Sequence, residues 1–105
     1  MTKIPIRDYR DFWDLPRIFL VERNDVILLF DCKFDEDKED YDNTYSVYVM
    51  PDLAGRELAG SWNQLTNKAL KLLGTLSVEE VVFDASRRKW IDDDVIAQRF
   101  FKQEA

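Results

Sequence analysis

The residues best suited to chemistry in this sequence are six carboxylates within eight positions: Asp35, Glu36, Asp37, Glu39, Asp40 and Asp42. Calcium binding needs oxygen ligands at set positions, with a glycine at the sixth position of the loop and a glutamate at the twelfth. Counting from Asp35, those two positions hold Asp40 and Ser46, so we predict no metal site. We interpret this acidic run as a solvated connection between two strands, with a docking surface for a basic partner as the alternative.

Aromatic side chains among charges form a second candidate site. Phe12 and Trp13 are adjacent in a charged segment of the chain. Aromatic residues surrounded by charges are frequent anchors of protein interfaces, so a role in binding is one interpretation. The favoured interpretation is that the pair caps one end of the hydrophobic core.

A third candidate is basic. Arg87, Arg88 and Lys89 precede Trp90, and cations beside an aromatic ring could bind a phosphate or a nucleic-acid base. Asp84 and the three aspartates at 92–94 flank this cluster and cancel most of its positive field. Salt bridges around an ordinary turn are therefore the favoured interpretation.

Histidine is absent, which removes the commonest general base and the commonest zinc ligand. Cys32, the one cysteine, falls on the apolar face of an expected strand and is interpreted as a small buried hydrophobic residue. Asp31 and Asp84 could meet across a sheet as catalytic carboxylates if a cleft holds them. No glycine-rich phosphate loop or Cys-x-x-Cys occurs, so no cofactor is expected.

The net charge of −6 lies entirely in residues 1–60, which hold 14 acidic and 8 basic residues. Phosphate binding depends on Lys and Arg, so direct binding of nucleic acid is disfavoured. The longest aliphatic or aromatic run, Val26 to Phe30, is five residues, far short of the ~20 that cross a bilayer. With one cysteine and no apolar leader sequence, we expect a cytoplasmic protein that does not contact membranes.

Alternation of apolar and polar residues predicts most of the strands. It is strongest in residues 26–34, where Ile27 and Leu29 on the second face indicate that the sheet is covered on both sides. Asn24-Asp25 predicts a two-residue turn before this strand. The expected strands lie within residues 4–16 and at 17–23, 26–34, 44–50, 78–84 and 90–91.

Two helices are also predicted. Ser61 and Gln64 have the spacing of a capping box, an apolar stripe follows them, and Gly74 is placed to end this first helix. The second helix begins after Asp92, a good N-cap, and runs toward Ala105. The stripe of the first helix consists of Trp62, Leu65, Ala69, Leu72 and Leu73.

These elements predict a single α+β domain over residues 1–105. Its sheet is expected to be small and antiparallel, with four or five strands that begin as an N-terminal meander. Two helices accompany the sheet, and the order along the chain is β-β-β-α-β-(β)-α.

The missing catalytic residue types and the charged, aromatic segments favour a non-catalytic binding or regulatory module that contacts a protein partner. A basic partner would match the acidic run. Two alternatives stay open: a small carboxylate-using enzyme or accessory subunit, and an acidic mimic of nucleic acid that inhibits its target as some immunity proteins do. The candidate site residues are the six carboxylates of the acidic run with Phe12, Trp13, Arg87, Arg88 and Trp90.

Overall fold

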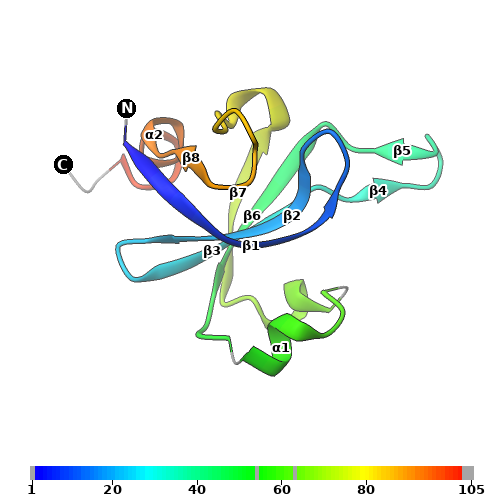
Figure 1. The fold of residues 1–105 in the computed structure, drawn as a ribbon, viewed down its shortest axis with the longest axis horizontal. Coiled ribbons are helices and arrows are strands. Elements are labelled where there is room, and N and C mark those ends of the chain that lie inside the picture. The colour runs from blue at the N-terminus through cyan, green and yellow to red at the C-terminus, as the bar shows by residue number, and fades with distance from the viewer. Residues whose placement is uncertain (1, 54, 63, 103–105) are drawn as a thin grey trace.

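The computed structural model describes residues 2–53, 55–62 and 64–102, and its main feature is a curled antiparallel sheet of six strands (Figure 1). The strands lie in the order β7-β6-β3-β2-β1-β8, and every neighbouring pair is antiparallel. Their bounds are β1 Lys3–Phe12, β2 Pro16–Arg23, β3 Val26–Asp31, β6 Thr44–Met50, β7 Lys71–Ser77 and β8 Trp90–Asp92. A separate two-stranded hairpin consists of β4 Phe34–Asp35 and β5 Asp40–Tyr41.

Helical segments are short in the described residues. They are the α-helices α1 Gly55–Ala59 and α2 Asp94–Phe100, and the 3-10 helices η1 Leu65–Lys68 and η2 Val78–Glu80. The predicted α+β fold, with four or five strands and two helices, is therefore wrong, because the protein is mostly β. None of the helices in this part of the chain is long and apolar enough to cross a membrane.

The helix predicted over residues 61–73 accounts for most of this error. The chain instead forms η1 and then β7, which pairs with β6 and so satisfies backbone groups that β6 would leave open as an edge strand. Gly74 does not end a helix but lies within β7, opposite Val47 and beside a β-bulge. Residue 63 lies outside the described residues.

The strand predicted over residues 78–84 is also wrong. Ser77 Oγ accepts a hydrogen bond from the backbone N–H of Glu79, and the Glu80 carboxylate accepts one from the N–H of Ser77. This capping box begins η2 and turns the chain away from the sheet. Between this segment and β8, the described residues form one isolated bridge, from Phe83 to Ile91.

The predicted turn and meander are confirmed. Asn24 and Asp25 have φ of 49° and 65°, and the strands on either side pair directly through Arg23 and Val26. β2, β3 and β6 are neighbours in an antiparallel meander. However, β3 ends at Asp31 and not at residue 34 as predicted, and the β4–β5 hairpin lies between β3 and β6 in the chain. Because both turn residues tolerate positive φ, this local signal was strong enough to fix the register.

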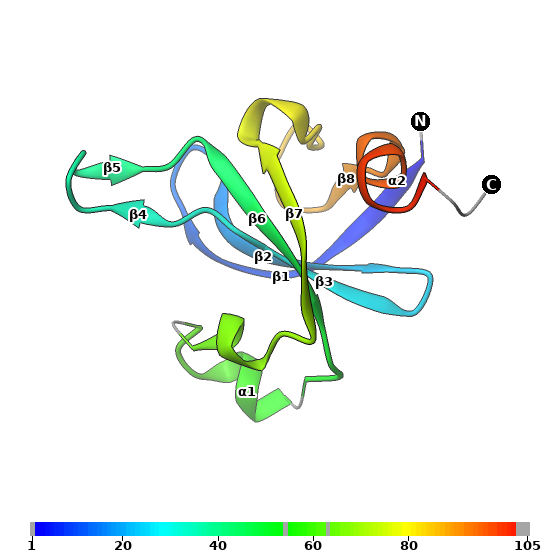
Figure 2. The same cartoon turned by 180° about the vertical axis from the view of Figure 1, so that it is seen from behind.

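The sheet is covered on both faces, as Ile27 and Leu29 indicated. The first core lies between the curled sheet and the segments η2 and α2, and includes Phe19, Phe30 and Tyr45. The second core contains Leu29 and is closed by Trp62 and Leu65, from the chain around α1 and η1. Figures 1 and 2 show these two layers on opposite sides of the sheet.

The C-terminal helix α2 begins after Asp93, one residue later than predicted. Asp93 does not cap the helix with its side chain but forms a buried ion pair with Arg23, with Nε and Oδ1 2.8 Å apart. Ile91 and Ile96 are both buried in the first core. The predicted continuation to Ala105 includes residues 103–105, which lie outside the described residues.

Candidate functional site

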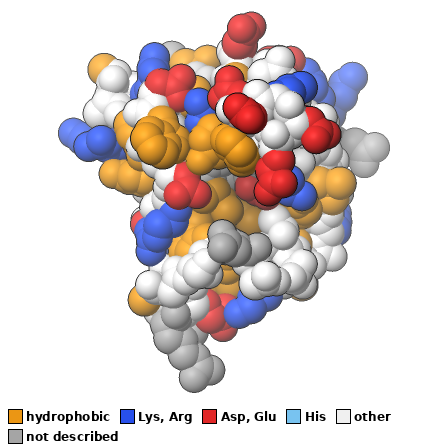
Figure 3. Space-filling view, turned by 90° about the vertical axis from the view of Figure 1, so that its right-hand side faces the viewer, with side chains coloured by type: hydrophobic (Ala, Val, Ile, Leu, Met, Phe, Trp, Pro, Cys, Tyr) orange, Lys and Arg blue, Asp and Glu red, His pale blue; other side chains and the backbone are white. Residues whose placement is uncertain are grey.

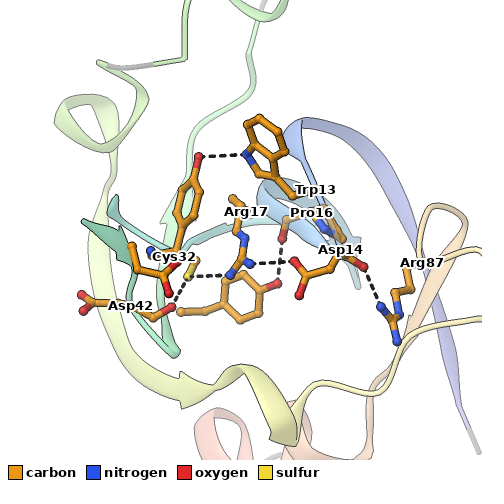
Figure 4. A network of polar contacts seen from close by, with 10 residues as sticks. Trp13, Asp14, Pro16, Arg17, Cys32, Asp42 and Arg87 are labelled. Carbon is orange, nitrogen blue, oxygen red and sulfur yellow. Dashed lines mark hydrogen bonds and ion pairs between the residues drawn. The ribbon is translucent and has the colours of Figure 1, made fainter. Parts of the chain in front are cut away.

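The segments that carry all three candidate sites meet at one end of the molecule. The indole N–H of Trp13 donates to the hydroxyl of Tyr41, at 3.2 Å, which joins the β1–β2 turn to the β4–β5 hairpin. The Arg87 guanidinium donates to the backbone carbonyl of Asp14, at 2.6 Å, and so joins the loop 84–90 to the same turn. Figure 4 shows these contacts in one network.

The acidic run forms the β4–β5 hairpin, which projects from the sheet (Figures 1 and 2). Asp35 Oδ1 accepts hydrogen bonds from the backbone N–H groups of Asp37 and Lys38, at 2.9 and 3.4 Å, so the turn is ordered by its own side chain. Residues 35–42 contain six carboxylates and a single lysine. The described residues contain no group of three or more side chains that could hold a metal ion.

The adjacent aromatic residues Phe12 and Trp13 have different surroundings. Phe12 is partly buried against Tyr9, with ring centroids 5.6 Å apart, and Arg88 stacks over its ring at 4.4 Å. Trp13 is 71% exposed. Phe12 therefore belongs to the packed structure and Trp13 to the surface.

Trp13 belongs to an exposed aromatic cluster that the sequence showed only in part. Phe34, at the base of the hairpin, is 53% exposed and packs edge-on against Tyr41, with ring centroids 5.3 Å apart. Trp13 contacts the hydroxyl of the same tyrosine. In Figure 3, which faces this end, hydrophobic side chains lie exposed among acidic ones, above a hollow with hydrophobic walls.

Arg17, on β2, holds the base of the hairpin in place. Its guanidinium stacks over the Tyr41 ring at 4.6 Å and donates to Asp14 Oδ1 at 2.6 Å. A longer contact of 3.8 Å reaches Cys32 Sγ, and the Cys32 thiol donates to the carbonyl of Asp42 at 2.8 Å. Sequence reasoning missed Arg17, because an arginine within a strand carries no signal of what it will contact.

Cys32 is 2% exposed, as expected for a small buried residue. Burial raises the pKa of its thiol, although the nearby Arg17 opposes this shift. The sulfur therefore keeps its proton at neutral pH and can donate it to Asp42. This hydrogen bond joins the chain just after β3 to the chain just after β5, at the base of the hairpin.

A pocket of about 400 Å³ opens beside the hairpin. Its carboxylates are Asp11 and Asp31, and neither makes a hydrogen bond or an ion pair with another described residue. Burial raises the pKa of Asp31, Lys33 opposes the shift, and the charge of Asp11 adds to it. The lining residues used below are Arg17, Ile18, Lys33, Phe34, Tyr41 and Trp62.

The carboxylate pair that the sequence suggested, Asp31 with Asp84, does not form. Asp84 organises the loop 84–90, where it accepts hydrogen bonds from the side chain of Ser86 and from the backbone N–H groups of Lys89 and Trp90. Burial alone would raise the pKa of Asp84, but these hydrogen bonds outweigh it and lower the pKa. The partner of Asp31 in the pocket is instead Asp11, which the sequence did not single out.

The basic cluster serves the structure rather than forming a patch of its own. Arg87 and Arg88 contact the β1–β2 turn, as described above. Trp90 lies on β8, where the Lys3 ammonium stands over its ring at 4.7 Å, so it does not join the aromatic cluster. Its inclusion among the candidate site residues has no support from this arrangement.

Comparison with known proteins gives no family to draw on. No protein-family model matches the chain, and neither curated proteins nor solved structures gave a significant match. Function is therefore inferred from the residues of this end of the molecule.

Proposed function

We propose that this protein is a non-catalytic module that binds a basic segment of a partner protein. The binding surface, called here the hairpin surface, consists of Trp13, Phe34 and Tyr41 with the carboxylates of the acidic run. The observation that carries the proposal is the exposure of Trp13 and Phe34, at 71% and 53%, beside an acidic hairpin.

The aromatic cluster has the properties of an interface anchor. Trp and Tyr are enriched among the residues that dominate binding energy, because they bury a large apolar area and also offer a polar atom. Tyr41 is already held by Trp13 on one side and Arg17 on the other. Binding would therefore cost little additional ordering of its side chain.

The charge of the hairpin indicates what kind of partner fits. Six carboxylates against one lysine give residues 35–42 a net charge of −5, and most of these side chains are exposed. Such a field attracts a basic surface and speeds its encounter, while it repels the phosphates of nucleic acid. A nucleic-acid mimic is less well supported, because these carboxylates are gathered on one hairpin instead of being spaced along a face.

The first prediction tests this surface. The tagged protein is used to capture partners from its own cell lysate at low and high salt, and the affinity of the purified partner is then measured by calorimetry. We expect Trp13→Ala to weaken binding by at least about tenfold, since a central aromatic anchor commonly contributes ~2 kcal/mol or more. Replacing Asp35, Asp37, Asp40 and Asp42 by Asn should slow association and reduce its salt dependence.

Two controls make this test specific. Asp25→Asn removes one exposed carboxylate at the β2–β3 turn, and Leu72→Ala removes an exposed apolar side chain on β7, so both should bind as wild type does. Equal affinity of wild type and Trp13→Ala would contradict the proposal. Failure to capture any protein at either salt concentration would remove its support.

A further inference from the structure

The pocket beside the hairpin is continuous with the hairpin surface, because Phe34 and Tyr41 belong to both. A partner held on the hairpin surface would therefore have side chains within reach of the pocket. Its volume of about 400 Å³ lies within the range of ordinary ligand sites, so one long side chain can enter it.

The charges that line the pocket favour a cation. Arg17 already forms an ion pair with Asp14 and stacks over the Tyr41 ring, although its buried Nε has no hydrogen-bond partner among the described residues. This leaves two carboxylates, on Asp11 and Asp31, against the single exposed ammonium of Lys33. The acidic hairpin next to the pocket adds to the negative potential.

Burial sharpens this preference at Asp31. Its carboxylate is only partly exposed and has no hydrogen-bond donor among the described residues. A charge that is poorly solvated and unpaired gains more from an incoming cation than an exposed charge does. Asp11 lies at the end of β1 with a φ of 54°, a backbone conformation that is uncommon for a residue other than glycine.

The walls of the pocket suit a planar cation. Trp62, Tyr41 and Phe34 supply aromatic rings, and Ile18 supplies an aliphatic surface. The fold already stacks guanidinium groups on two of these rings, with Arg10 over Trp62 and Arg17 over Tyr41, both at 4.6 Å. A guanidinium also offers several donors in one plane, so it can serve two separate carboxylates, whereas an ammonium acts as a point charge.

We infer that this pocket is a subsite for one arginine side chain of the partner, with Asp31 and Asp11 as its charge partners and the aromatic rings as its walls. This inference rests on the proposed function, because it assigns one contact within the same interface. It adds a requirement that the partner's basic segment carry an arginine next to the residues that pack on Trp13.

The second prediction uses a minimal probe, N-acetyl-arginine N-methylamide, titrated into the ¹⁵N-labelled full-length protein at pH 7. We expect saturable shifts of the backbone amides of Asp31 and Lys33 and of the Trp62 indole N–H, with a dissociation constant of about 1 mM. The citrulline analogue has the same shape without the charge, so it should cause no saturable shifts. The lysine analogue should bind more weakly than the arginine analogue.

Matched variants locate the site. Asp31→Asn and Asp11→Asn should each raise the dissociation constant at least tenfold, and asparagine tolerates the positive φ at position 11. Asp25→Asn, at the opposite end of the sheet, should bind as wild type does. Spectra of the free variants verify that each one is folded, so a loss of binding cannot be mistaken for unfolding.

The outcomes separate the two proposals. No saturable shift, equal binding of citrulline, or stronger binding of lysine overturns the arginine subsite. If the subsite fails while Trp13→Ala still weakens partner binding, the proposed function stands without it. If the probe binds as expected but Trp13→Ala leaves the affinity for the partner unchanged, the pocket is an arginine site and the proposed docking surface is wrong.

Discussion

Asp31 is a charged residue whose partial burial is unfavourable for folding. The end of β3 places its carboxylate in the pocket, where burial raises its pKa and the nearby Lys33 offsets this only in part. The folded protein therefore holds this proton more tightly than the unfolded chain, in which an aspartate has a pKa of about 3.9. The protonated group therefore stabilises the fold fully at a pH below the pKa of the unfolded chain. This contribution is lost as the pH rises through the raised pKa of the folded state.

Our third prediction follows from that sign. At pH 7 the ionised Asp31 is a cost to folding, so Asp31→Asn should raise the melting temperature measured by circular dichroism. At pH 3 the protonated Asp31 of the wild type is neutral, as is the asparagine of the variant. The difference in melting temperature between the two proteins should therefore disappear. A lower melting temperature of the variant at pH 7 would mean that Asp31 has a stabilising partner in the fold, which would also weaken the arginine subsite.

Sequence reasoning identified some residues of the candidate site and not others. Trp13 and the acidic run were singled out by residue type and spacing alone, although a cap on the core and a solvated connection were the favoured interpretations. Asp11, Arg17 and Trp62 were not, because they come together only through the pairing of β1 with β2 and the packing of η1 beneath the sheet. Contacts between residues so distant in the chain leave no periodic signal in the sequence.

At the scale of elements, Gly74 explains why β7 was mistaken for part of a helix. A glycine after an apolar stripe is typical of a helix end, yet here it has φ of 153° within a strand. A Cβ at this position would lie 2.9 Å from Cε1 of Phe100, so the missing side chain lets α2 pack closely on β7. A glycine that ends a helix and one that admits a neighbouring ring look the same in the sequence.

The fourth prediction compares two glycines. Gly74→Ala should lower the free energy of unfolding by about 1–3 kcal/mol, because it combines an unfavourable φ with overpacking against Phe100. Gly55→Ala is the control: nothing lies within 4 Å of its Cβ, so we expect a change within about 0.5 kcal/mol. Urea denaturation measures both, and equal stability of the two variants would contradict the packing described here.

The strands of the meander were predictable for the opposite reason. In β2, β3 and β6, alternation and the Asn24-Asp25 turn both point to the same structure, so local preference and tertiary pairing agree. In residues 61–73 they disagree. Spacing suited to a helix was overruled there by the open edge of β6, whose backbone groups needed partners.

At the scale of the whole molecule, one buried ion pair connects elements that are far apart in the chain. Arg23, at the end of β2, donates to Asp93, at the start of α2, and its guanidinium stacks over Phe101 at 4.2 Å. Both side chains of the pair are almost fully buried, at 7% and 11% exposure. The pair thus anchors α2 over the first core.

The fifth prediction concerns this anchor. Asp93→Asn should lower the free energy of unfolding by about 1.5–3 kcal/mol, since it weakens a hydrogen bond between two buried charges. The neighbouring exposed Asp94→Asn should cost less than about 1 kcal/mol, the usual effect of an acid in the first turn of a helix. Chemical denaturation measures the free energy of unfolding of both variants. An unchanged value for Asp93→Asn would show that the apolar contacts of α2 are enough to hold it on the first core.

Cys32 gives the chain a built-in reporter on the movement of the hairpin. It is the only thiol in the sequence, it is 2% exposed, and its hydrogen bond to Asp42 closes the base of β4 and β5. A thiol reagent can reach the sulfur only when this base opens, so the rate of modification measures the frequency of local opening. A partner that binds the hairpin would slow that reaction, so its binding could be followed from the rate of modification.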